Sequence, residues 1–168
     1  MKENPIITSP WTRISHSPEE TAELANELAG LFAPKGLVML SGDLGSGKTT
    51  LTQDLLKAWG YKGSVKSPTF DLVHVYPLPA FTVYHADLYR LQGDDGLDIL
   101  DLPSPHDAHS IIIAEWGEAL RSLYPEGFAL SLEACGEKCR QVELTAYGPG
   151  AQQRLQQWRT SQSLKRRS

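Results

Sequence analysis

The residues best suited to chemistry are a lysine and a threonine at the end of a glycine-rich stretch. The pattern G-x-x-x-x-G-K-[ST] is matched at every fixed position by Gly42-Asp43-Leu44-Gly45-Ser46-Gly47-Lys48-Thr49. Glycines let such a loop curl so that its backbone N–H groups converge on phosphate oxygens. Lys48 then neutralises the β- and γ-phosphates, and the Thr49 hydroxyl is a ligand for Mg²⁺. The loop therefore predicts binding of a nucleoside triphosphate with Mg²⁺.

A loop of this kind needs a carboxylate at the end of a neighbouring strand, to hold the metal or to orient water. Glu115 fits this need, because it ends the apolar run Ile111-Ile112-Ile113-Ala114. The alternative for Glu115 is an ordinary exposed acid. Asp87, which closes the strand-like segment Phe81–His85, is a second candidate. Its alternative is a simple ion pair with Arg90.

Three further residues have a functional and a structural interpretation. Trp116 follows Glu115 and is either a core aromatic or a contact for the nucleotide. Thr69, in Ser67-Pro68-Thr69-Phe70, either places a hydroxyl at the γ-phosphate or belongs to a turn before a strand. Arg90 stabilises charge in the transition state or forms a surface salt bridge. Local sequence leaves these alternatives open.

The elements that must position these residues alternate between strands and helices. A helix begins after His16, with Ser17 as N-cap and Pro18 at its first position. The other expected elements are a strand over 37–40, a helix over 49–59, a strand pair over 70–76 and 81–85, a central strand over 111–114, a strand pair over 128–133 and 141–146, and a short helix over 151–158. This order predicts an α/β fold, a single P-loop NTPase-like domain whose mixed central sheet is flanked by helices and carries antiparallel hairpins.

Composition limits the remaining possibilities. The 168 residues fit one domain, which we expect over 15–147, after an N-terminal extension over 1–14 and before a helical or frayed tail over 148–168. The net charge of −4 gives no general reason to bind nucleic acid or membrane. No signal peptide or long apolar run is present, so the expected compartment is the cytoplasm. Cys135 and Cys139 are expected to be reduced thiols near a turn.

Four stretches, in their order and spacing, resemble the TsaE family, bacterial ATPases of tRNA threonylcarbamoyladenosine synthesis. They are Gly42-Asp43-Leu44-Gly45-Ser46-Gly47-Lys48-Thr49-Thr50, Val65-Lys66-Ser67-Pro68-Thr69-Phe70, His85-Ala86-Asp87-Leu88-Tyr89-Arg90-Leu91 and Glu115-Trp116. Ser17-Pro18-Glu19-Glu20-Thr21 is also similar to the family's entry helix, so the resemblance covers about residues 15–147. Many families share the first stretch, whereas the S-P-T-F, H-x-D-x-Y-R and E-W motifs are far more specific.

The resemblance implies an ATPase that supports transfer of a threonylcarbamoyl group to the adenosine beside the anticodon of tRNA. It implies TsaD and TsaB as partners, with tRNA met indirectly through their complex. By the same resemblance Lys48 binds phosphate, Thr49 and Glu115 hold Mg²⁺, and Asp87 assists the metal or water, which makes Lys48, Asp87 and Glu115 the catalytic set. The implied ATP contacts are Asp43, Leu44, Gly45, Ser46, Gly47, Lys48, Thr49, Thr50, Thr69 and Trp116.

The sequence departs from the family pattern at three places. Ser46 replaces the alanine that is commonest in the loop, a small change that leaves the backbone cradle possible. The aspartate-rich stretch Gly93–Ser110 lacks the usual Pro-Glu-Glu-Leu. The hairpin around the two cysteines often carries an arginine near the nucleotide, and both Lys138 and Arg140 are candidates for it here.

Other classes of P-loop protein fit less well. A kinase for a small metabolite needs a lid with several arginines, and Gly93–Ser110 contains neither arginine nor lysine. A GTP-driven switch needs N-K-x-D, which is absent, as is D-x-x-G. An adaptor that binds ATP without hydrolysing it shares every phosphate contact with an ATPase. Because only Asp87 stands out as a base for water, slow hydrolysis by the isolated chain is expected.

Overall fold

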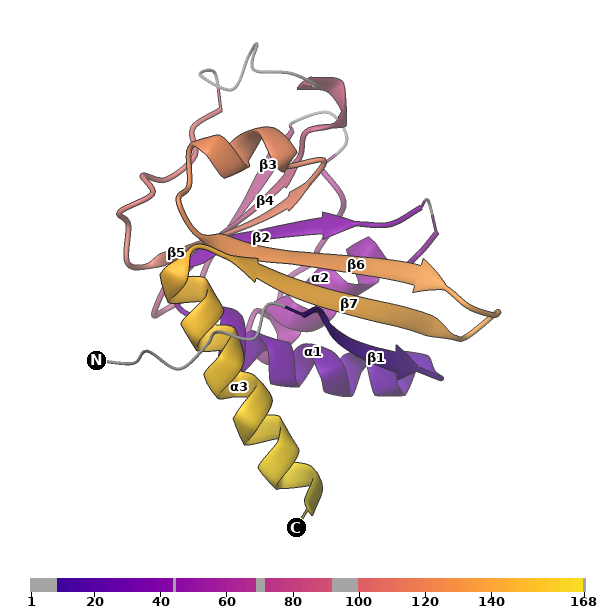
Figure 1. Cartoon of the computed structure of the whole chain (residues 1–168). Coiled ribbons are helices and arrows are strands. Elements are labelled where there is room, and N and C mark those ends of the chain that lie inside the picture. The colour runs from indigo at the N-terminus through magenta and orange to yellow at the C-terminus, as the bar shows by residue number, and fades with distance from the viewer. Residues whose placement is uncertain (1–8, 44, 69–71, 92–99, 168) are drawn as a thin grey trace, which may run out of the picture.

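A seven-stranded sheet with the order β1-β7-β6-β2-β5-β4-β3 forms the centre of the molecule (Figure 1). The computed structural model describes residues 9–43, 45–68, 72–91 and 100–167. The strands are β1 (Trp11–Ser15), β2 (Gly36–Ser41), β3 (Val73–Pro77), β4 (Thr82–Asp87), β5 (Ser110–Glu115), β6 (Gly127–Ala134) and β7 (Arg140–Tyr147). The helices are α1 (Pro18–Phe32), α2 (Lys48–Ala58) and α3 (Pro149–Arg167), with short 3₁₀ helices η1 (Tyr89–Leu91) and η3 (Glu118–Ser122).

Strand direction decides where the chemistry can lie. The four central strands β6, β2, β5 and β4 are parallel, whereas β3, β7 and β1 join the sheet antiparallel to their neighbours. The carboxyl ends of parallel strands meet at one edge of a sheet, where α/β proteins bind their ligands. The residues after β2, β4 and β5 are therefore brought to the same edge. The predicted mixed sheet and both antiparallel hairpins, β3–β4 and β6–β7, are confirmed.

Side chains that alternate along β2 divide the core into two layers. Val38 and Leu40 face a cluster formed with α1, α2 and α3, which lie on one side of the sheet (Figure 1). Leu37 and Met39 face the other side, where Leu120 of η3 completes a smaller cluster. This period of two is what a strand imposes on a continuous apolar run. Helix α2, which follows the glycine-rich loop, packs against the sheet through the first of these clusters.

The start of α1 follows the local signals of the sequence. The Ser17 side chain accepts a hydrogen bond from the Glu20 amide at 3.1 Å, and the Glu20 carboxylate accepts one from the His16 amide at 2.7 Å. Pro18 occupies the first turn, where its missing N–H costs nothing. The first bond satisfies an amide that a helix start leaves without an intrahelical partner, and the second ties the preceding residue to the first turn. The predicted capped helix is confirmed.

Two elements differ from the sequence-based expectation. Residues 11–15 form β1, which the sequence did not indicate, and Trp11 is opposite Leu144 of β7. The last helix continues to Arg167 rather than ending near Trp158, because no glycine or proline follows Gly150 to stop it. Among the described helices, none is both long and apolar enough to cross a membrane. The three-part division of the chain stays a prediction.

The expectation of reduced thiols at Cys135 and Cys139 is wrong. The two residues form a disulfide in the turn between β6 and β7. The pairing of Ala134 with Arg140 closes the hairpin directly before and after them, and their Cα atoms lie 5.0 Å apart. That separation lies within the range that a disulfide bridges without backbone movement. The register of the β6–β7 hairpin therefore brings the two cysteines together, and the number of cysteines alone did not indicate this.

Candidate nucleotide-binding site

The glycine-rich loop leaves the end of β2 and enters α2 through backbone that favours glycine. Gly42, Gly45 and Gly47 have φ angles of +146°, +81° and +105°. A Cβ added at Gly42 would collide with the Leu132 carbonyl oxygen and would lie 2.6 Å from Ser46 Oγ. The loop therefore packs closely against β6, and a side chain at Gly42 is sterically excluded.

The amino end of α2 presents unpaired amides to the space above the loop. Gly47 is the N-cap and has no side chain that could cap the helix. The first helical hydrogen bond runs from the Leu51 amide to the Gly47 carbonyl, at 2.8 Å, so the amides of Lys48, Thr49 and Thr50 have no partner within the helix. Together with the positive end of the helix dipole, these amides form an anion site of the kind that holds phosphates.

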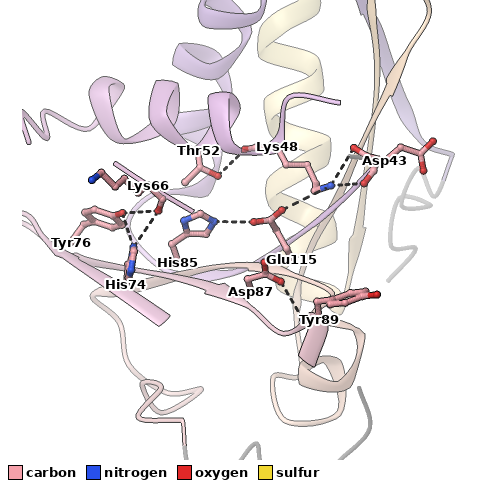
Figure 2. Close-up of polar contacts among 11 residues, drawn as sticks. Asp43, Lys48, Thr52, Lys66, His74, Tyr76, His85, Asp87, Tyr89 and Glu115 are labelled. Carbon is pink, nitrogen blue, oxygen red and sulfur yellow. Dashed lines mark hydrogen bonds and ion pairs between the residues drawn. The ribbon is translucent and has the colours of Figure 1, made fainter. Parts of the chain in front are cut away.

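Lys48 connects the loop to the acid of the neighbouring strand. Its Nζ donates to the carbonyl oxygen of Gly42 and, at 3.4 Å, to that of Asp43. The same Nζ lies 3.9 Å from Glu115 Oε1 (Figure 2). The ammonium group thus stands between the loop and the end of β5, where a polyphosphate would pass.

Glu115 and Asp87 end neighbouring parallel strands in register with each other. Glu115 is 6% exposed, so its carboxylate is largely shielded from water. Its Oε2 lies 3.3 Å from Nε2 of His85, a buried residue of β4. Asp87 is half-buried, and its Oδ1 accepts a hydrogen bond from the Tyr89 amide at 3.2 Å. The two acids predicted to serve the metal and water are therefore adjacent.

Two aromatic side chains form one rim of the site. Trp116 is 50% exposed and Tyr89 is 56% exposed, and their rings meet edge to face with centroids 5.1 Å apart. Trp116 also has a φ of +58°, an uncommon backbone conformation for a bulky residue. The interpretation of Trp116 as a core aromatic is therefore wrong, because its ring lies at the surface beside the loop.

Arg140, rather than Lys138, is the cation that the β6–β7 hairpin brings to the loop. Its Nε donates to the Ser46 carbonyl oxygen at 2.8 Å, and one of its terminal nitrogens donates to the Cys139 carbonyl oxygen at 2.8 Å. Lys138 is exposed on the turn. Of the two candidates, Arg140 is therefore the one whose side chain contacts the loop, and its contact with a nucleotide stays a prediction.

The loop, the start of α2, the two acids, the two aromatic rings and Arg140 line one cleft of about 1070 Å³. The predicted residues that line it are Asp43, Gly45, Ser46, Gly47, Lys48, Thr49, Thr50, Asp87, Glu115 and Trp116. Leu44 and Thr69 lie outside the described residues, although Ser67, which precedes Thr69, also lines the cleft. The part of the chain that carries the predicted chemistry is thus gathered in one place.

The donor set fits Mg²⁺ bound together with phosphates. Within the described ranges, no three His, Cys, Asp or Glu side chains are close enough to hold a metal by themselves. Mg²⁺ does not need such a cage, because it keeps several waters and uses one or two protein oxygens with substrate phosphates. Thr49 and Glu115 supply two oxygen-bearing side chains to the cleft.

Sequence reasoning missed two parts of the site. His85 belongs to a quoted motif but received no role, and its contact with Glu115 depends on the pairing of β4 with β5. Tyr89, which packs on Trp116, was also not identified. The H-x-D-x-Y-R motif, which begins at His85 and includes Tyr89, was the signal that could have pointed to both residues.

Comparison with known proteins agrees with this geometry. The family described as "Threonylcarbamoyl adenosine biosynthesis protein TsaE" matches residues 15–142. A tRNA threonylcarbamoyladenosine biosynthesis protein TsaE from Haemophilus influenzae is 39% identical over 110 residues, which cover 66% of this chain and 70% of the relative. The protein of the same name from Bacillus subtilis is 31% identical over 139 residues, or 82% of this chain and 85% of the relative.

A solved structure shows the same fold. The crystal structure of YdiB from Bacillus subtilis matches with a TM-score of 0.72 and 26% identity, over 91% of this chain and 96% of that one. The segment matched by the family, 15–142, contains the glycine-rich loop, Asp87 and Glu115. The chain therefore belongs to the TsaE family.

Proposed function

We propose that this chain binds ATP with Mg²⁺ in the cleft and hydrolyses it slowly, in support of threonylcarbamoyl transfer to the adenosine beside the anticodon of tRNA. The observation that carries this proposal is the position of Lys48 Nζ, which contacts loop carbonyls and lies 3.9 Å from Glu115 Oε1. Membership of the TsaE family supports the connection with tRNA modification.

Each residue has one task in this proposal. Lys48 and the first amides of α2 bind the β- and γ-phosphates, and Thr49 and Glu115 hold the metal. Bound Mg²⁺ supplies charge neutralisation at the phosphates. Asp87 orients water. Trp116 covers one side of the nucleotide.

Slow hydrolysis follows from the shortage of a strong base for water. Asp87 is half-buried and already accepts a hydrogen bond from Tyr89. We therefore assign the chain to a complex with TsaD and TsaB, in which partners complete the machinery and carry the tRNA. The net charge of −4 supports this indirect contact with tRNA, because RNA binding needs a basic surface. Such a complex would work in the cytoplasm.

Calorimetry with ATP and Mg²⁺ tests the binding step. Heat of association is expected for the wild-type chain, with weaker association for GTP, and no heat for Lys48→Ala. Wild-type protein that gives no heat, at concentrations well above micromolar, contradicts the proposal. Labelled ATP then separates an ATPase, which releases labelled free phosphate, from a kinase for a small metabolite, which gives a labelled organic product.

Co-purification tests the complex. The tagged chain, mixed with TsaD and TsaB, is expected to retain both proteins in a manner that depends on ATP. Equal retention with ATP, with ADP and without nucleotide would show that the nucleotide does not control assembly.

A further inference from the structure

His85 is a fully buried polar side chain that the proposed chemistry does not yet use. It lies in β4 opposite Ile113 of β5, and its exposed fraction is 0%. Its Nε2 is 3.3 Å from Glu115 Oε2, while its Nδ1 is buried and has no hydrogen-bond partner in the described part of the chain. A buried polar atom without a partner costs free energy, so a histidine at this position requires a reason.

The absence of a partner for Nδ1 among the described residues favours one tautomer of the His85 ring. With hydrogen on Nε2, the ring donates to Glu115 and leaves only a lone pair unsatisfied at Nδ1. With hydrogen on Nδ1 instead, a buried N–H would lack an acceptor, and the lone pair of Nε2 would face the carboxylate. Unsatisfied acceptors are tolerated better than unsatisfied N–H groups in protein interiors. This comparison favours the tautomer in which His85 Nε2 donates to Glu115 Oε2.

The two oxygens of Glu115 consequently face different neighbours. Oε2 is held by His85 from inside the sheet, and Oε1 lies 3.9 Å from Lys48 Nζ on the cleft side. Figure 2 shows this chain of contacts, which runs from His85 through Glu115 to Lys48 and on to the loop carbonyls. A carboxylate anchored by one oxygen has its other oxygen fixed in direction.

We propose that His85 is a positioning residue, which holds the Glu115 carboxylate so that Oε1 is presented to Mg²⁺. This inference rests on the proposed function, because it assumes that Glu115 ligates the metal of MgATP. Hydrogen-bond partners of metal ligands commonly orient the ligand in this way, and their loss typically lowers metal affinity by about 10- to 100-fold. A histidine that served only to fill the core would leave metal affinity unchanged.

Three substitutions separate positioning from packing. His85→Gln places an amide N–H where Nε2 stands and keeps the donor. His85→Asn places the same amide at the position of Nδ1, too short to reach Glu115. His109→Asn makes the same change at an exposed histidine just before β5 and is the control.

The measurement is the affinity for Mn²⁺ in the presence of ATP, followed by electron paramagnetic resonance of the free ion. His85→Asn is expected to lower the affinity for Mn²⁺ by about 10-fold or more. The affinities of His85→Gln and His109→Asn are expected to stay close to that of the wild type. ATP binding with EDTA present is expected to be unchanged in all three. Equal metal affinity in His85→Asn and wild type overturns the inference, as does an equal loss in His85→Gln and His85→Asn.

A second experiment needs no variant and therefore does not depend on how the variants fold. In nitrogen NMR of the ¹⁵N-histidine-labelled wild-type chain, Nε2 of His85 is expected to carry the hydrogen, and its resonance is expected to move when Mg²⁺ is added to the ATP-bound protein. Hydrogen found only on Nδ1 overturns the inference. Wild-type protein that binds neither ATP nor metal would instead refute the proposed function, and calorimetry with MgATP distinguishes that result.

Discussion

The guanidinium of Arg140 donates from Nε to the backbone carbonyl oxygen of Ser46 at 2.8 Å, across 94 positions of sequence. Its Nη1 also donates to the carbonyl oxygens of Cys139, at 2.8 Å, and Gly136, at 3.3 Å. One planar cation thus joins the β6–β7 turn to the glycine-rich loop. Because it holds a loop carbonyl on the side of the hairpin, Arg140 helps to keep the loop in the shape that directs amides into the cleft.

Removal of this link is expected to weaken nucleotide binding. A hydrogen bond from a charged group contributes about 1.5–3 kcal/mol, so Arg140→Ala should lower the affinity for MgATP by about 10-fold or more. Arg140→Lys keeps the positive charge but lacks the several N–H donors of the planar guanidinium, so its affinity for MgATP should lie between those of Arg140→Ala and wild type. Arg121→Ala, which removes a cation stacked on Tyr147, is the control for charge. Calorimetry that finds Arg140→Ala equal to Arg121→Ala would contradict this account.

The disulfide is expected to stabilise the hairpin without being required for the loop contact. Cys135 and Cys139 enclose a very short loop, for which the chain-entropy relation gives about 2 kcal/mol. The Cys135 amide also donates to the Cys139 carbonyl oxygen at 3.1 Å, which closes the turn independently. Replacing both cysteines by serine should therefore lower the free energy of unfolding by about that amount. Chemical denaturation measures it.

The control is the wild-type protein unfolded with and without a dithiol reductant. Reduction should reproduce the loss seen in the serine variant and have no further effect on that variant. An identical midpoint for oxidised and reduced wild-type protein would show that the bond contributes nothing.

Two glycines of the loop are expected to respond differently to alanine. At Gly42 the new Cβ meets the Leu132 carbonyl oxygen, which belongs to β6 and cannot move aside. At Gly45 nothing lies within 4 Å, so only the positive φ of +81° opposes the change. Gly45→Ala should cost about 1–2 kcal/mol, and Gly42→Ala about 3 kcal/mol or more together with loss of ATP binding. Thermal unfolding and calorimetry that rank the two variants in the opposite order would refute the packing of this loop.

Local chemistry made much of this fold predictable. The capping residues around Ser17, the apolar strand before Gly42 and the continuous run before Glu115 each act within a few positions of the chain, and each predicted its element. Because β2, β4 and β5 are parallel, their carboxyl ends lie at the same edge of the sheet. Strand β1 was not predicted because its side chains alternate between half-buried and exposed over most of its length. Its pairing is also distant in sequence, since Trp11 is opposite Leu144 of β7.

The missed contacts share one physical cause. Arg140 reaches Ser46, and His85 reaches Glu115, only after strands that are distant in sequence have paired in one register. Shifting a strand by one residue would turn each side chain to the other face of the sheet. No local pattern encodes that register. The disulfide was not predicted for the same reason, because the number of cysteines does not indicate which residues face each other across a turn.

Asp54 in α2 provides a prediction about pH. Partial burial raises the pKa of its carboxyl group above the usual value, and Lys57 opposes only part of that shift. For an acid whose folded pKa is raised, the charged form is disfavoured by folding, so stability is lost above the folded pKa and regained below it. Asp54→Asn should thus be more stable than wild type at neutral pH.

The difference in the free energy of unfolding between Asp54→Asn and wild type should decrease as the pH falls through the folded pKa of Asp54. Urea denaturation at several pH values measures it, with Asp101→Asn, a change at an exposed position, as the control. A difference between Asp54→Asn and wild type that is the same at acidic and neutral pH would rule out titration of Asp54 as the cause.

Lys48 Nζ and Glu115 Oε1 lie 3.9 Å apart. Replacing the two residues should nevertheless have different effects on ATP binding and turnover. Lys48→Ala removes the cation proposed to bind the phosphates, so both ATP binding and turnover should be abolished. Glu115→Ala removes the proposed metal ligand and a negative charge from the cleft, so turnover should be abolished while ATP binding in EDTA persists and strengthens slightly. Metal-free calorimetry and phosphate release distinguish the two. Wild-type turnover by the Glu115 variant would remove that carboxylate from the metal site, because no second buried acid of the described chain lines the cleft.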